Sequence, residues 1–408
     1  MKILLVTHLV PYPPRGGCSL RNFNLIKECS KRHEIHLLTF YQKAHLYGHS
    51  NLGDNIKEMQ KYCKEVRVFE IPTDGKKLRW SLLLLLNLFS SKPYSTWRFH
   101  SKEMVNAVKE AVNTESFDLM EIGTIALAEY SKLAPNLPKL LVHHNIESEL
   151  LIRRAAGLKN PLARAYVAHQ GRKLRNYEKE AARFFDYHTT VSDRDGETLK
   201  EADPGANVQT VPNGVDTEYF TSINTATEEN SLIFIGAPNW FPNLDAMTYL
   251  IRDIWHLITA EIPDLSMYYI GKNPPPEIKK FAEHNPSFKP LGFVDDVRPY
   301  MSRASVYIVP IRIGGGTRLK ILDAMSMSSA IVSTSIGCEG IDVSHGKDIL
   351  IADSPETIAR ETIRLLKDNA LRTELGENAR ATAERLYSWK VVAPKLEWVY
   401  NQLAGMRE

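Results

Sequence analysis

The chain has 408 residues, of which 43% are hydrophobic and 24% charged, and this composition is ordinary for a soluble globular protein of two to three domains. Its four cysteines form no C-x-x-C pair, which excludes a cysteine metal site and indicates the reduced thiols of a cytoplasmic protein. The net charge of +3 is uneven, because residues 1–213 hold 31 Lys or Arg against 23 Asp or Glu (net +8) and the remainder is net −5, so we expect the first half to face something anionic.

The first expected strand is Lys2–Val6, a continuous apolar run whose pattern indicates burial on both faces. It is too short, and too soon followed by prolines, to be a signal peptide. The loop after it ends in Gly16-Gly17 before a helix that begins near Ser19, which predicts the first turn of a Rossmann-like unit with backbone free to approach a ligand. A plain surface loop is the alternative, since the turn lacks G-x-G-x-x-G.

Strands and helices alternate through the rest of the first half, and this alternation predicts a parallel, doubly wound sheet. Ser192-Asp193 is expected to cap one of the helices. The expected strands are Glu34–Phe40, Glu65–Ile71, Phe117–Ile122, Lys139–Val142, Tyr187–Val191 and Val208–Val211.

Leu78–Phe89 interrupts this rhythm, because it is apolar on nearly every side and half the length that a bilayer requires. Basic residues flank it on both sides. It is either a buried core helix, which we favour, or an interfacial helix whose basic ends meet lipid headgroups.

His143 and His144 follow the expected strand Lys139–Val142, at the sheet edge where open α/β folds bind ligands. Adjacent side chains on an extended chain point apart, and no third metal ligand is evident. A single histidine that lines a cleft is therefore the better interpretation.

The second half begins the same pattern again after a tight turn at Pro212–Asp216. Its expected strands are Ser231–Ile235, Leu265–Ile270, Phe288–Leu291, Ser305–Val309 and Ala330–Ser333, with an amphipathic helix over Asn243–Ala260. We expect an α/β chain of two Rossmann-like domains facing across a cleft. They comprise residues 1–213 and 214–387, followed by a terminal helix over 388–408 for which a return to the first domain is one option.

A glycine-rich stretch, Gly314–Gly316, lies between the strand Ser305–Val309 and a helix. Such a turn offers unpaired N–H groups and the positive end of a helix dipole to an anion. Arg318 and Lys320 place two cations in the first turn, where they oppose the dipole, so we expect a diphosphate to neutralise them; Asp323, about a turn later, could accept from sugar hydroxyls. The alternative is a glycine-rich turn with solvated charges, since the run is not a P-loop.

These features together resemble the retaining glycosyltransferases of family four, which have the GT-B fold. The resemblance runs the length of the chain and is closest to bacterial enzymes that build surface polysaccharide. It rests on Gly16-Gly17, a histidine after an inner strand, Val191-Ser192-x-x-Asp195, Pro212–Asp216, Gly292-Phe293-Val294 and Gly314–Met325.

The resemblance implies a role for each matching position. His144 corresponds to the active-site histidine, with His143 as the competing choice. Asp323 replaces the glutamate that holds the ribose. The remaining donor-binding positions are Gly16 and Gly17 at the diphosphate, Val294 at the nucleobase, Gly315, Gly316, Thr317, Arg318 and Leu319 at the phosphate and sugar, and Lys320 as a cation.

Three departures from the family pattern concern the donor. The first of the family's paired carboxylates is replaced by Gly315, and the second is shortened to Asp323. The phosphate-binding cations early in the second domain are missing, with Ala237 and Asn243 roughly at their positions, so Arg318 and Lys320 are the plausible replacements. Asp193-Arg194-Asp195 spells D-x-D, but it lies within a family motif and we assign it no metal.

The expected function is transfer of a sugar, with retention and without a metal or other cofactor, from a nucleoside-diphosphate sugar to a glycan or lipid-linked acceptor. A sugar-nucleotide epimerase or phosphorylase of the same fold, or a non-catalytic sugar-nucleotide-binding subunit, is the alternative. Nucleic acid is not expected as a partner, since there is no RNA-binding motif or zinc finger. The basic first half and Leu78–Phe89 suggest that this cytoplasmic protein attaches peripherally to an anionic membrane.

Overall fold

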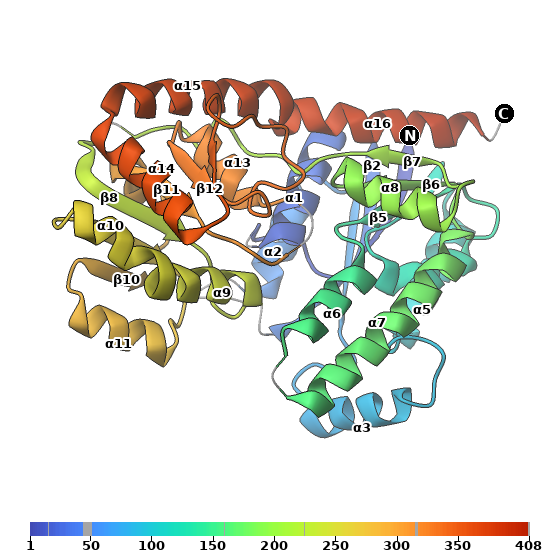
Figure 1. Cartoon of the computed structure of the whole chain (residues 1–408). Coiled ribbons are helices and arrows are strands. Elements are labelled where there is room, and N and C mark those ends of the chain that lie inside the picture. The colour runs from blue at the N-terminus through green and yellow to red at the C-terminus, as the bar shows by residue number, and fades with distance from the viewer. Residues whose placement is uncertain (15, 44–50, 159, 224, 315–316, 407–408) are drawn as a thin grey trace. The chain divides into compact units, whose positions relative to one another are not determined.

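The computed structural model describes residues 1–14, 16–43, 51–158, 160–223, 225–314 and 317–406 (Figure 1). Two compact units divide the chain. Unit 1 comprises Met1–Pro212 together with Val392–Glu408, and unit 2 comprises Asn213–Val391.

Unit 1 is built on a seven-stranded parallel sheet in the order β3-β2-β1-β4-β5-β6-β7. The inner strand β1 is buried from Ile3 to Thr7, as its apolar run predicts. The strands are β1 Lys2–Thr7, β2 Glu34–Tyr41, β3 Glu65–Glu70, β4 Leu119–Ile122, β5 Lys139–His143, β6 Tyr187–Thr190 and β7 Val208–Thr210.

Four helices of unit 1, namely α2, α5, α7 and α8, start at a side chain that caps the helix N-terminus. Ser101 accepts a hydrogen bond from the Met104 amide, and Ser192 accepts one from the Asp195 amide, as the sequence predicted for Ser192. The Asp195 carboxylate in turn accepts from the Ser192 hydroxyl at 2.8 Å. The helices are α1 Gly17–Cys29, α2 Leu52–Met59, α3 Lys77–Asn87, α4 Tyr94–Arg98, α5 Lys102–Thr114, the 3-10 helix Ile125–Leu133, α6 Glu147–Ala156, α7 Pro161–Ala182 and α8 Asp193–Ala202.

Helix α3 is the main correction to the sequence analysis, because the favoured core interpretation of Leu78–Phe89 is wrong. Leu78 is 85% exposed and Phe89, just after the helix, 89% exposed. Asn87 is the only residue of α3 classed as buried. A helix that is apolar on nearly every side can be core or interfacial, and periodicity alone does not separate the two cases.

Unit 2 contains a six-stranded parallel sheet in the order β10-β9-β8-β11-β12-β13. Its strands are β8 Glu228–Ile235, β9 Ser266–Ile270, β10 Phe288–Gly292, β11 Ala304–Val309, β12 Ile331–Ser333 and β13 Leu350–Ile351. The expected helix Asn243–Ala260 is divided into α9 Phe241–Tyr249, a π-helical turn Leu250–Ile254 and α10 Trp255–Glu261. The other helices are α11 Pro276–His284, α12 Arg298–Arg303, α13 Leu319–Ser326, α14 Pro355–Lys367 and α15 Asn369–Leu386.

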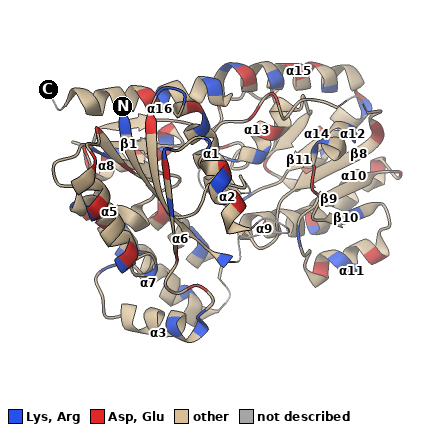
Figure 2. Ribbon diagram, turned by 180° about the vertical axis from the view of Figure 1, so that it is seen from behind, with Lys and Arg blue, Asp and Glu red and all other residues tan. Residues whose placement is uncertain are grey.

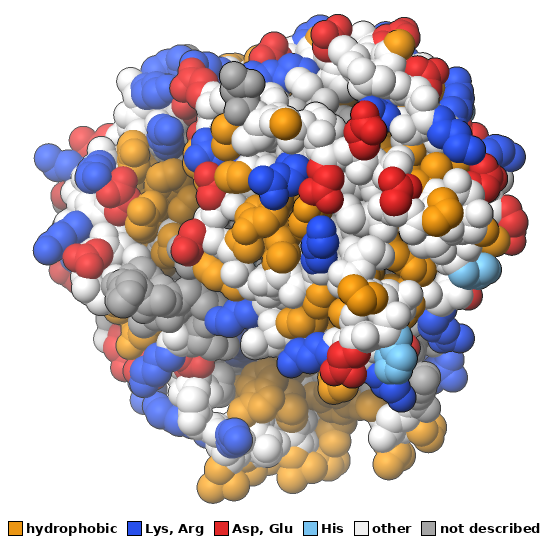
Figure 3. Space-filling model, turned by 90° about the vertical axis from the view of Figure 1, so that its left-hand side faces the viewer, with side chains coloured by type: hydrophobic (Ala, Val, Ile, Leu, Met, Phe, Trp, Pro, Cys, Tyr) orange, Lys and Arg blue, Asp and Glu red, His pale blue; other side chains and the backbone are white. Residues whose placement is uncertain are grey.

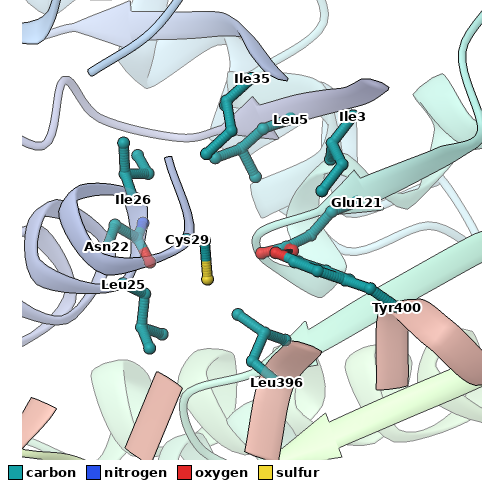
Figure 4. Close-up of a pocket in the computed structure, with 10 residues that line it drawn as sticks. All are labelled: Ile3, Leu5, Asn22, Leu25, Ile26, Cys29, Ile35, Glu121, Leu396 and Tyr400. Carbon is teal, nitrogen blue, oxygen red and sulfur yellow. Dashed lines mark hydrogen bonds between the residues drawn. The ribbon is translucent and has the colours of Figure 1, made fainter. Parts of the chain in front are cut away.

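The terminal helix α16, Trp389–Gly405, begins in unit 2 and continues into unit 1. Within unit 1 it is fixed by Tyr400, whose hydroxyl donates to the buried Glu121 carboxylate of β4, and by Glu397, which pairs with Arg32 at 2.6 Å. Figure 4 shows Glu121 and Tyr400 pointing toward one another beside a cavity of about 10 Å³. That volume is at the lower limit for a single water molecule, so this cavity does not hold a substrate.

Both units therefore have the parallel α/β architecture that the alternation of strands and helices predicts. In each, the carboxyl ends of the parallel strands carry the loops at which such sheets bind ligands.

Candidate functional site

In unit 2 the predicted anion site lies where β11 leads into α13. Arg318 is the N-cap residue of α13, and the first turn contains no acidic side chain. Gly314 has φ +152°, and a Cβ at this position would lie 2.7 Å from an Arg318 guanidinium nitrogen. A glycine is therefore required for the arginine to pack against the backbone here. Gly315 and Gly316 lie outside the described residues.

Arg318 is held beside this turn by contacts within unit 2. Its guanidinium donates to the carbonyl of Ile336 at 3.1 Å and lies 4.0 Å from the Glu339 carboxylate. The side chain is 10% exposed. A fixed, largely dehydrated guanidinium at a helix N-terminus is well suited to a phosphate, because the side chain loses little further conformational freedom when the phosphate binds.

Lys320 reaches the loop after β8, where the sequence analysis found the expected cations missing. Its Nζ donates to Asn243 Oδ1 at 2.6 Å and lies 4.2 Å from the centre of the Phe234 ring. A Cβ on Gly236 would lie 2.8 Å from this nitrogen. Lys320 thus places a cation against the Gly236–Asn243 segment although that segment contains no Lys or Arg.

Burial disfavours the charged forms of both titratable residues on α13. It lowers the pKa of Lys320 to about 7, and the neighbouring Arg318 charge acts in the same direction. Burial also raises the pKa of Asp323 to about 7, while the Lys320 charge acts against that rise. Asp323 Oδ1 is buried and has no hydrogen-bond partner among the described residues. A buried carboxylate oxygen without a donor is costly unless a ligand supplies one.

The other predicted donor residues of unit 2 lie at two places. Thr317 is 9% exposed and its carbonyl accepts from the Asn213 side chain at 3.4 Å, while Leu319 packs against the core at the start of α13. Val294 follows β10, after Gly292 with φ +75° and a half-exposed Phe293, and is also partly buried against the core.

In unit 1 the structure separates the two adjacent histidines. His143 is 3% exposed, and its Nε2 lies 3.2 Å from Nδ1 of the buried His188. His144 is half-buried, and its ring centre lies 6.2 Å from that of His8. Burial, together with the Arg21 charge, holds the pKa of His144 well below its usual value, so the ring is neutral. Its Nε2 has no partner among the described residues.

Two residues beside His144 were given no role by the sequence analysis. Glu147 begins α6, and burial followed by the charge of Glu178 raises its pKa to about 7. Arg21 is 1% exposed and donates to the carbonyls of Val211 and Pro212 at 2.8 and 2.6 Å. It thereby fixes α1, whose N-cap Gly16 has φ 102° and whose first residue is Gly17. Neither the raised pKa of Glu147 nor the buried position of Arg21 could be predicted from the neighbouring sequence, because both depend on burial by distant segments.

A larger open pocket in unit 1, of about 290 Å³, contains none of the predicted site residues. Its walls come from α6, α7 and α8 and carry charges of both signs, among them Arg175, Glu178 and Asp203. No group of three His, Cys, Asp or Glu side chains that could hold a metal ion occurs in the described part of the chain.

Comparison with known proteins supports the resemblance of unit 2 to glycosyltransferases. Residues 229–368 match the family model for glycosyl transferases group 1. A 44.6 kDa protein from the cps region of Klebsiella pneumoniae is 26% identical over 169 residues, which are 40% of this chain and 44% of that protein. The phosphatidyl-myo-inositol mannosyltransferase of Mycobacterium tuberculosis is 24% identical over 217 residues, 49% of this chain and 56% of the enzyme. The matches thus span about half the length of these relatives.

The fold of the chain is also found among solved structures. HepE from Anabaena, solved in complex with UDP, superimposes with a TM-score of 0.66 at 15% identity, over 98% of this chain and 100% of that chain. At this identity the likeness concerns the fold alone. The chain thus has the GT-B fold of glycosyltransferases, and its residues 229–368 match the family model for glycosyl transferases group 1.

Proposed function

We propose that the protein is a glycosyltransferase that moves a sugar from a nucleoside-diphosphate sugar to a glycan or lipid-linked acceptor of surface-polysaccharide assembly. The observation that carries the proposal is the first turn of α13, where Arg318 packs beside Gly314 and Lys320 reaches the loop after β8, within the segment that matches the family. The names of the relatives, one from a cps region and one acting on a phosphatidylinositol, support the class of acceptor.

In this proposal the diphosphate lies at the N-terminus of α13. When the bond between the anomeric carbon and the diphosphate oxygen breaks, negative charge develops on the diphosphate, and Arg318, Lys320 and backbone N–H groups stabilise it. These cations perform the task that a divalent metal would otherwise perform, so the transfer requires no metal. Asp323 accepts hydrogen bonds from the ribose hydroxyls, which would satisfy its unpartnered Oδ1.

The proposed stereochemical outcome is retention. The acceptor hydroxyl attacks the anomeric carbon from the face that the diphosphate leaves, and its proton passes to the departing diphosphate oxygen. His144 is neutral, with an Nε2 free of described partners, so it can accept from or donate to a sugar hydroxyl and position the substrate. It forms no covalent bond in this scheme.

Incubation with a panel of UDP-, GDP- and ADP-sugars, followed by separation of the products, tests the proposal. Slow release of nucleoside diphosphate, accelerated by a glycan or lipid-linked acceptor, is the expected result, and added chelator should not reduce it. Inversion of the sugar within the intact nucleotide sugar would identify an epimerase, and release of sugar 1-phosphate with inorganic phosphate as acceptor a phosphorylase. Binding without any turnover would identify a non-catalytic subunit.

A further inference from the structure

Helix α3 and the start of α7 form an exposed apolar surface on unit 1, which we call the leucine surface. Three of its side chains are more than four-fifths exposed: Leu78 at 85%, Phe89 at 89% and Leu162 at 81%. Hydrophobic side chains gather at the lower end of Figure 3, the end at which Figure 1 shows α3. Its other exposed members are Leu82, Leu85, Leu86 and Leu88. Folded proteins rarely leave so many large apolar side chains together in water without a partner.

The segments that carry the leucine surface contain basic residues and no acidic ones. Residues 75–102 hold six Lys or Arg and no Asp or Glu, and residues 150–177 hold seven and none. Figure 2 shows blue but no red on α3. Lys76, Lys77, Arg79, Arg154 and Arg164 are exposed. An apolar surface with basic residues around it is complementary to an anionic lipid bilayer, which offers acyl chains beneath charged headgroups.

Polar contacts fix α3 in this exposed position. The buried Asn87 accepts at its Oδ1 from Gln170 of α7 at 3.0 Å, and its carbonyl accepts from Lys173 Nζ at 2.6 Å. Gln170 also accepts from the Tyr94 amide at 3.2 Å. These bonds attach the end of α3 to α7 while its leucines remain outside. Buried polar side chains of unit 1 thus hold the leucine surface in its exposed position.

We propose that the leucine surface inserts into the interfacial layer of an anionic membrane. The 11 residues of α3 are about half the number that a spanning helix needs. Among the described residues no helix is long and apolar enough to cross a membrane. The helix therefore lies in the plane of the interface, with its leucines toward the acyl chains and its lysines and arginines at the headgroups. Self-association through this surface would bring like charges together, whereas anionic lipid neutralises them.

A chain of ring contacts connects the leucine surface to the candidate active-site histidine. Arg98 lies over the rings of Trp80 in α3 and Phe99, at 5.6 and 5.4 Å from their centres. Phe99 lies 6.1 Å from His8, which lies 6.2 Å from His144. Resting on the proposed transferase function, we infer that the acceptor is carried by a lipid and reaches His144 from the membrane side of unit 1.

Flotation of the full chain with vesicles tests the membrane contact independently of catalysis. The expected result is binding to phosphatidylglycerol-containing vesicles, none to pure phosphatidylcholine, and release by high salt. Lys76→Glu with Lys77→Glu should weaken binding by at least about 25-fold, since each basic residue at an anionic surface contributes about fivefold. Lys279→Glu with Lys280→Glu, an exposed pair in unit 2, makes the same charge change and should bind as wild type.

The apolar contribution is tested by Leu78→Ser with Phe89→Ser. These substitutions lie on exposed side chains, so the fold should survive, and vesicle binding should fall on the order of 100-fold. Phe184→Ser with Met406→Ser, two partly exposed apolar residues of unit 1 away from α3, is the matched control.

Two results would overturn the inference. One is wild-type protein that ignores anionic vesicles at low salt. The other is a concentration-dependent dimer without vesicles that Leu78→Ser with Phe89→Ser disperses, because the occupant would then be a second copy. Nucleoside-diphosphate binding measured on the same samples separates this failure from failure of the proposed transferase function. If vesicles bind but only a water-soluble acceptor is glycosylated, the lipid-borne acceptor is wrong and the membrane contact stands.

Discussion

The pKa of Lys320 leads to a quantitative prediction about donor binding. Burial lowers this pKa to about 7, so ligand-free molecules lose the ammonium as the pH rises through neutrality. A bound diphosphate favours the charged form and raises the pKa in the complex. Affinity is therefore highest below pH 7 and falls as the pH rises toward the pKa of the complex.

The size of the effect follows from the fraction of charged lysine. Raising the pH from 7 to 9 should weaken nucleoside-diphosphate binding by on the order of tenfold, because the neutral amine no longer supplies a charge-assisted hydrogen bond. The phosphate groups do not contribute over this range, because their last pKa is about 6. Lys320→Met removes the cation while retaining an unbranched side chain, so binding should weaken by about 1.5–3 kcal/mol at pH 7 and should no longer weaken as the pH rises.

Isothermal titration calorimetry with UDP, GDP and ADP at pH 7, 8 and 9 measures these quantities on whichever nucleotide binds best. The corresponding nucleoside is the control and should not show the effect of Lys320→Met. Lys320→Met also leaves Asn243 Oδ1 without its donor, so the midpoint of thermal unfolding without ligand is measured as the control for folding. A wild-type affinity that is constant from pH 7 to 9, or Lys320→Met protein that binds as tightly as wild type, would exclude Lys320 as a contact of the diphosphate.

Three further predictions concern the start of α13 in unit 2 and His144 in unit 1. Arg318→Ala should weaken nucleoside-diphosphate binding by about 1.5–3 kcal/mol and leave nucleoside binding unchanged; equal losses for both ligands would argue against a phosphate contact. Wild type should prefer a ribonucleotide to its deoxyribo analogue, and Asp323→Asn should remove most of that preference in a competition assay, whereas a wild type that binds both equally would exclude the ribose contact. His144→Ala should lower kcat for transfer and leave the nucleoside-diphosphate Kd unchanged, so a loss confined to donor affinity would place this histidine elsewhere.

The sequence was sufficient for the architecture and for the helix that carries the cations. Alternating strands and helices predicted both parallel sheets. The helix α13 begins directly after Arg318, where the glycine-rich turn and the spacing of the apolar residues indicated a helix. These features are local, since a strand or a helix N-terminus is largely encoded by its own residues.

Tertiary contacts determine three features that the sequence could not predict: the exposure of α3, the contact of Lys320 with Asn243 and the different surroundings of the two histidines. The leucines of α3 have the composition of a core helix, and only the attachment of Asn87 to α7 explains why they lie outside. The approach of Lys320 to Asn243, 77 positions away, has no local signal. The different surroundings of His143 and His144 depend on His188 and His8, which come from other parts of the chain.

Amide hydrogen exchange with and without the best-binding nucleoside diphosphate tests most directly whether the start of α13 holds the donor. We expect protection on binding to be concentrated in peptides covering 317–326, with a second protected segment at 236–243 where Lys320 meets Asn243. Protection of these segments should disappear in Lys320→Met protein at a nucleotide concentration that saturates wild type. Unchanged exchange over 317–326, with protection instead in the α6–α8 pocket of unit 1, would contradict the account.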